Sequence, residues 1–136
     1  MPSINSVRPL EIPREEWKSL LDRFTEAHCG WKVTIETYDR KTDEHVTSPE
    51  AALRSVVFDL EDSKNSRINV TVLLGNKEIR HILFQPWQLI LRTSKQTGDE
   101  ALIIESLNLE TTIRLRRPPQ SRVLPFKPTR ESARSR

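Results

Sequence analysis

The feature that most constrains the fold is a change of hydrophobic period at Gly30. Before this glycine, apolar residues recur every three or four positions, as they do along one face of an amphipathic helix. These residues are Trp17, Leu20, Leu21, Phe24 and Ala27. After it, Trp31, Val33 and Ile35 alternate with polar residues, which is the pattern of a half-buried strand. The sequence therefore predicts a single helix over residues 12–30 that leads directly into a strand.

Short strand patterns then follow at close spacing, with turn-forming residues between them and no further helix. They cover residues 55–61, 68–74, 79–84, 87–93, 101–107 and 111–116. Neighbouring strands joined by short turns pair antiparallel. We expect an α+β domain in which the N-terminal amphipathic helix packs on a bent antiparallel β-meander of five to seven strands, with closure into a small barrel as the alternative. The polar segment 40–52 is expected to be a loop.

Basic residues are concentrated toward the C-terminal end of the chain. Residues 114–136 contain eight lysines and arginines against Glu131, a net charge of +7, whereas the whole chain carries +3. The last 19 residues include four prolines and few large apolar groups, too few to offset the entropy of ordering. We therefore expect one domain over residues 11–117, followed by a basic flexible tail over residues 118–136.

Several classes of protein are disfavoured by the composition. No apolar run approaches the roughly 18 residues of a membrane span, and the first residues lack the features of a secretory signal. The single cysteine, Cys29, has no partner for an internal disulfide. The three histidines and three glycines form neither a metal-ligand pattern nor a phosphate-binding loop. A cytoplasmic protein without metal, cofactor or membrane contact is expected.

The adjacent residues His28 and Cys29 do not predict nucleophilic catalysis, because neighbours on a helix point about 100° apart. His81 shares a strand face with Ile79 and Leu83, which favours a core histidine over a ligand. We take His81, Trp87 and His28 as the candidate surface for a ligand or partner. An enzyme would need a pocket in which His81, Trp87 and the end of the helix meet.

The last strand and the tail provide the candidate surface for nucleic acid, because lysine and arginine contact phosphates. Its residues are Arg114, Arg116, Arg117, Arg122, Lys127, Arg130, Arg134 and Arg136. Phe126 is the only aromatic residue in this region, so aromatic stacking on several bases is not expected. A solubilising tail is the favoured interpretation, and nucleic-acid binding is the alternative.

Four sequence pieces resemble a family of small bacterial soluble proteins of unknown function. They are "IPREEW", the pattern F-x-x-x-H-x-G-W at Phe24, His28, Gly30 and Trp31, then "RHILFQPWQLIL" and "ALIIESLNLETTIRLR". The chain departs from the family pattern at Ser55, where a glycine is expected, and at Asn108-Leu109, where an Asp-Gly turn is expected. The second departure leaves the register of the last hairpin open. None of these pieces is a known catalytic signature, so the resemblance is uninformative about mechanism.

The favoured hypothesis is a non-enzymatic interaction or regulatory module whose partner is an unidentified protein. Nucleic-acid binding through the basic strand and tail is one alternative, and an enzyme with a pocket near His81 is another. The oligomeric state is left open by the sequence.

Overall fold

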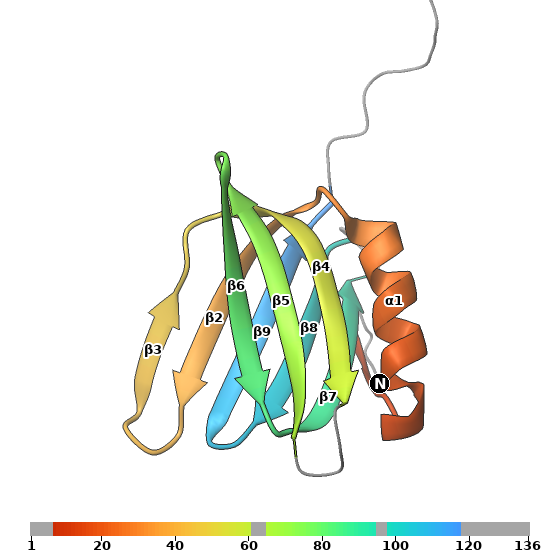
Figure 1. Cartoon of the computed structure of the whole chain (residues 1–136), viewed down its shortest axis with the longest axis vertical. Helices are drawn as coiled ribbons and strands as arrows, with labels where there is room; N and C mark the ends of the chain where they lie inside the picture. The colour runs from red at the N-terminus through yellow and green to blue at the C-terminus, as the bar shows by residue number, and fades with distance from the viewer. Residues whose placement is uncertain (1–6, 61–64, 95–97, 118–136) are drawn as a thin grey trace, which may run out of the picture.

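The computed structural model describes residues 7–60, 65–94 and 98–117, and the predicted tail lies outside this range. The chain begins with strand β1 (Val7–Glu11), a short 3-10 turn at Arg14–Glu16 and helix α1 (Trp17–His28). Eight strands follow, and together with β1 they form a nine-stranded antiparallel sheet (Figure 1). They are β2 (Lys32–Asp39), β3 (Glu44–Thr47), β4 (Ala51–Leu60), β5 (Ser66–Leu74), β6 (Lys77–Phe84), β7 (Pro86–Ser94), β8 (Glu100–Ser106) and β9 (Leu109–Arg116).

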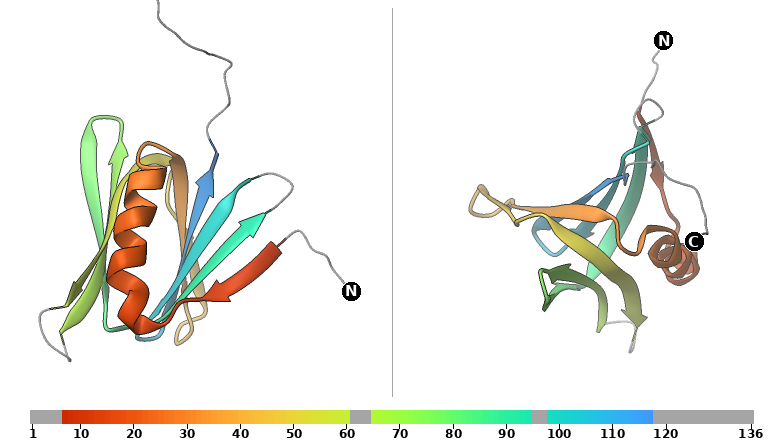
Figure 2. Two further views of the ribbon diagram at one scale, coloured as in Figure 1. Left: turned by 90° about the vertical axis from the view of Figure 1, so that its right-hand side faces the viewer. Right: turned by 90° about the horizontal axis from the view of Figure 1, so that it is seen from above.

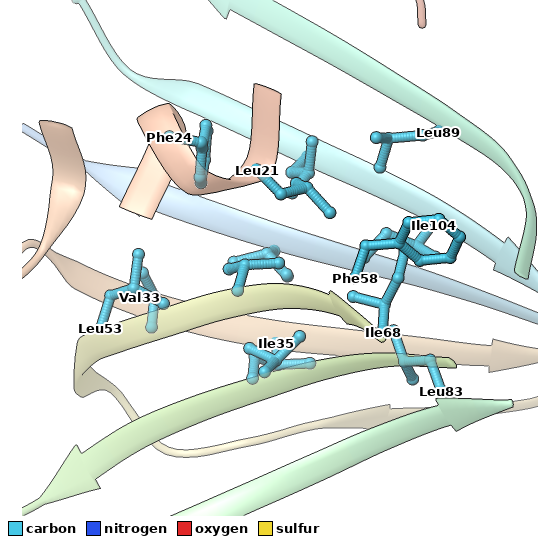
Figure 3. Packing of buried hydrophobic residues seen from close by; sticks show 14 of the residues in the cluster. Leu21, Phe24, Val33, Ile35, Leu53, Phe58, Ile68, Leu83, Leu89 and Ile104 are labelled. Atoms are coloured by element: carbon cyan, nitrogen blue, oxygen red, sulfur yellow. The ribbon is translucent and has the colours of Figure 1, made fainter. Parts of the chain in front are cut away.

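The sheet bends sharply between β2 and β4. Its strand order is β1-β7-β8-β9-β2-β4-β5-β6, and β3 pairs with β2 outside this path. β4 pairs with β2 only at Lys32–Ala52 and Val33–Ala51, and then leaves it. The β4-β5-β6 half consequently lies in front of β8, β9 and β2, as Figure 1 shows. The inward-facing side chains of the two halves, including Ile68, Leu83 and Ile104, meet in one core (Figure 3).

Helix α1 covers the side on which the two halves of the sheet diverge (Figure 2). Its buried residues are Trp17, Leu21, Phe24 and His28. The rings of Trp17 and Phe58, which lies on β4, meet in a T-shaped arrangement with their centres 5.2 Å apart. The predicted helix and its apolar stripe are thus largely confirmed, although Ala27 is exposed and His28 takes its place on the buried face.

Thr25 joins the helix to the backbone of β4. Its hydroxyl donates to the carbonyl oxygen of Val56 at 3.0 Å and accepts the N–H of Val56 at 2.9 Å. At this position β4 pairs with β5 on one side but no longer with β2 on the other. The threonine therefore satisfies backbone groups that would otherwise lack a partner inside the fold.

Two expectations about the sheet were wrong. The sheet has nine strands rather than five to seven. It is also open, with β1 and β6 at its ends, so the alternative of a small closed barrel is not realised. Segment 40–52 is not a loop, because it contains β3 and the start of β4. All four residues of β3 are exposed, so this strand has no alternating apolar pattern to reveal it.

The two departures from the family pattern coincide with irregularities of the sheet. Ser55 lies at a shift of register between β4 and β5 that follows Leu53. The last hairpin turns at Leu107-Asn108, one residue earlier than the expected Asn108-Leu109, so that Ser106 faces Leu109. The register left open by the sequence is thereby defined.

Candidate functional site

A hollow of about 620 Å³ lies at the end of the molecule where helix α1 begins. We call it the Trp87 hollow, and its lining residues are Arg14, Leu60, Ser66, Gln85, Pro86, Trp87 and Leu107. They come from the turn before α1, the end of β4, the start of β5, the β6–β7 connection and the β8–β9 turn. Five separate chain segments therefore converge on this site.

Trp87 is directed outward by an irregularity in the β7–β8 ladder. Pro86 faces Ser106 and Gln88 faces Glu105, so Trp87 is the additional residue between two regular pairs. Its side chain is 57% exposed, and its indole N–H donates to the carbonyl oxygen of Leu107 at 3.2 Å. The bulge and this hydrogen bond hold a large aromatic surface against the β8–β9 turn, facing solvent.

Leu107 occupies a backbone conformation that leucine rarely adopts. Its φ is 53°, in the left-handed region, and its side chain is 51% exposed. The comparable two-residue turn between β5 and β6 places Gly75 at this position, with a φ of 67°. Leu60, which is 54% exposed, adds a third apolar side chain to the hollow. Neither folding nor solubility explains a strained, exposed leucine beside an exposed tryptophan.

Arg14 provides the positive charge of the Trp87 hollow. Its two terminal nitrogens donate to the carbonyl oxygen of Pro86 and to the hydroxyl of Ser66, both at 3.1 Å. The guanidinium carbon lies 4.8 Å from the ring centre of Trp17 and 5.3 Å from that of Phe58. No carboxylate in the described part of the chain pairs with Arg14. Among the described residues, the arginine is fixed in position by hydrogen bonds and ring contacts and not by an ion pair.

His28 lies at the other end of the helix and serves the packing of the core. Its Nδ1 is 2.8 Å from the carbonyl oxygen of Phe24, and its Nε2 is 3.1 Å from a carboxylate oxygen of Glu100. The ring also stacks on Phe24 and meets the edge of Trp31. Both ring nitrogens are engaged. A 12-residue helix is about 18 Å long, so His28 is remote from the Trp87 hollow.

His81 lies on the inner face of β6 with Ile79 and Leu83, as predicted, and is half-buried. Burial lowers the pKa of its imidazole below the ordinary value. Its side chain makes no hydrogen bond within the described residues. The structure does not bring His81, Trp87 and His28 into one site.

Glu105 is the one buried carboxylate among the described residues, and Arg40 neutralises it. Nη2 of Arg40 donates to Oε2 of Glu105 at 2.8 Å, and Nη1 bonds the other oxygen. This hydrogen bonding raises the pKa of the Arg40 guanidinium. The pair connects the β2–β3 turn to β8, which identifies it as a structural ion pair.

The basic side chains of the last strand are paired with carboxylates. Arg114 donates to Glu36 at 2.8 Å and Arg116 to Glu50 at 2.7 Å. They border a second hollow, of about 560 Å³, on the outer face of β2, β9, β8 and β7. Among the described residues, four basic and four acidic side chains line it, and their formal charges cancel. Arg117 is exposed, and Arg122, Lys127, Arg130, Arg134 and Arg136 lie outside the described residues.

Sequence reasoning identified Trp87 but missed its neighbours Arg14, Leu60 and Leu107. The segments that carry these residues are far apart in the sequence, and only the bend of the sheet assembles them. One signal was available. A leucine beside Asn108 in a predicted two-residue turn is unusual, because such turns favour glycine, asparagine and aspartate.

No helix in the described ranges is long and apolar enough to cross a membrane. No curated protein and no solved structure matches the sequence. A family model does match it, over residues 9–124, which covers the described residues from Pro9 onward and continues past Arg117. The chain therefore belongs to DUF5335, a family of unknown function.

Proposed function

We propose that the protein is a non-enzymatic interaction module that binds an acidic, apolar segment of a partner protein in the Trp87 hollow. The observation that carries the proposal is the exposure of Trp87, Leu60 and Leu107 around a single hollow, with Leu107 in a strained backbone conformation. Strain of this kind is retained where the side chain has a use. Tryptophan and arginine are also the residues that most often dominate binding energy at interfaces.

The chemistry of the hollow specifies the partner segment. A large apolar side chain would cover Trp87 and Leu107 and remove their surface from water. A carboxylate next to it would pair with Arg14, whose guanidinium has no acidic partner in the described part of the chain. Charge complementarity thus favours an acidic over a basic segment.

The carboxylate partners of Arg114 and Arg116 give less support to nucleic-acid binding, because a phosphate would have to compete with Glu36 and Glu50. The enzyme alternative also has less support, because His81, Trp87 and the end of the helix lie apart. We therefore favour a protein partner.

A random peptide library displayed on phage, selected on the full chain, tests the proposal. We expect the selected peptides to share a large apolar residue next to aspartate or glutamate. Their binding, measured by fluorescence anisotropy, should weaken at least tenfold in Trp87→Ala. It should also weaken when the acidic residues of the peptide are replaced by amides.

Val46→Asn is the matched control, because Val46 is an exposed apolar residue of β3 that does not line the hollow. This variant should bind the peptides as the wild type does. In NMR spectra, the indole N–H signal of Trp87 should shift on titration. Peptides that bind Trp87→Ala with undiminished affinity, or a selection that yields no binder, would contradict the proposal.

A further inference from the structure

Within the described residues, β1, β3 and β6 each lack a strand partner along the whole of one side, and β6 differs from the other two. β1 is five residues long and contains Pro9, which has no N–H to offer. β3 has four residues. β6 has eight residues, contains no proline and pairs with β5 without a shift of register. Natural proteins usually protect such a long regular edge.

No described strand pairs with the free edge of β6. Its inner face carries Ile79, His81 and Leu83. On the outer face, Ile82 is 42% exposed and Phe84 is 51% exposed. The edge therefore combines unpaired backbone groups with apolar side chains on both faces, which are the features of an edge that accepts another strand.

We propose that β6 pairs antiparallel with β6 of a second copy of this chain, about a two-fold axis at His81. In this register Ile79 lies opposite Leu83 of the second copy, so the inner apolar row continues across the seam. On the outer face Arg80 lies opposite Ile82, and Glu78 lies opposite Phe84. No two like charges face each other directly.

The arrangement accounts for the isolated imidazole of His81. The ring is half-buried and has no hydrogen-bond partner within the described residues. Because burial lowers its pKa, the ring is neutral at neutral pH. A neutral imidazole has one N–H donor and one acceptor nitrogen, so two such rings at the axis can bond to each other. The second copy supplies the partner that one chain lacks.

Sedimentation of the full chain from about 1 to 300 µM tests for the dimer, because a seam of one strand pair is a small interface of the kind that forms weak, reversible complexes. We expect a reversible monomer–dimer equilibrium. His81→Lys, which directs a charge inward at the axis, should raise the dissociation constant at least tenfold. Val46→Lys, on the free edge of β3, should leave it unchanged. A wild type that remains monomeric at every concentration would overturn the proposal, and so would equal effects of His81→Lys and Val46→Lys on the dissociation constant.

Cysteine cross-linking tests the register, in a Cys29→Ser background because the native cysteine is exposed. His81→Cys should form a disulfide-linked dimer under mild oxidation, since directly opposed residues have Cα atoms about 4.5 to 5.5 Å apart. Glu78→Cys alone should not, because the two positions lie about 20 Å apart along the seam. Rapid cross-linking of Glu78→Cys alone would refute this register.

A mixture of Glu78→Cys and Phe84→Cys tests the same register without altering the inner face, since both sites are exposed. Only the mixture should give a disulfide between chains. Its failure to cross-link would overturn the proposal even if His81→Cys does not fold. Because these sites do not line the Trp87 hollow, peptide binding there can succeed or fail independently.

Discussion

Leu107 shows how one residue can oppose the local preference of its own turn. Its left-handed backbone costs about 1 to 2 kcal/mol for an ordinary L-residue. Its carbonyl accepts the indole N–H of Trp87, and its side chain faces solvent. Local energetics would favour glycine or asparagine here, so the leucine side chain is better explained by what it contacts outside the chain.

Leu107→Asn should therefore raise the free energy of unfolding by about 0.5 to 1 kcal/mol, because asparagine tolerates the left-handed region. Urea unfolding followed by tryptophan fluorescence measures this change. The same variant should lose affinity for the selected peptides, which separates a binding role from a structural one. A loss of stability would show that Leu107 supports the fold.

His81 gives the domain a defined dependence on pH. Its pKa is lowered in the folded chain by burial, whereas the unfolded chain takes up a proton near pH 6.5. The contribution of this residue to stability is therefore complete above that pH and declines as the pH falls through it. Below the folded-state pKa, His81 is protonated in both the folded and the unfolded chain and causes no further loss of stability.

His81→Gln should lose less stability than the wild type between pH 7 and pH 5. Thermal unfolding at low protein concentration measures the difference in the monomer. His45→Gln replaces an exposed histidine of β3 and should retain the decline of the wild type. Parallel pH profiles for the wild type and His81→Gln would contradict the assignment.

At the scale of elements, the docking of α1 on β4 depends on Thr25 as well as on apolar packing. Thr25→Val keeps the shape of the side chain but removes both hydrogen bonds to Val56. We expect the free energy of unfolding to fall by about 1 to 3 kcal/mol, the cost of leaving backbone groups unsatisfied. Chemical denaturation measures it. Ser19→Ala, which removes only a solvent-exposed hydrogen bond from Arg23 on the same helix, should change it by less than about 0.5 kcal/mol.

The elements that the sequence predicts well are those with one buried face. The period of α1 and the alternation of β2 and β6 report directly which residues are buried. β1 and β3 were missed for a different reason. β3 is fully exposed and β1 contains Pro9, so neither shows the usual strand pattern. β1 pairs with β7, which is distant in the sequence, and β3 pairs with β2, which has a buried face. These pairings decide the structure of the two strands.

For the whole molecule, the class of fold was predictable but the site was not. Short connections between strands indicate an antiparallel sheet, yet they do not specify where it bends. The bend follows from the brief contact of β2 with β4 at only two residue pairs. It brings Leu60 close to Trp87 and Leu107, and no local pattern contains that information.

The strand order also has a consequence for synthesis on the ribosome. β1 pairs with residues 90–94 of β7, and one side of β2 pairs with β9. Neither pairing can form until the later strand has been synthesised. Contacts between such distant segments slow folding, because closing the long loop between them costs entropy before the contacts contribute any stability. β4, β5 and β6 follow one another directly and pair in that order. During translation the β2–β3 hairpin and then this meander can form before β7, β8 and β9 are made, so nascent chains expose the free edge of β6 before the opposite half of the core exists.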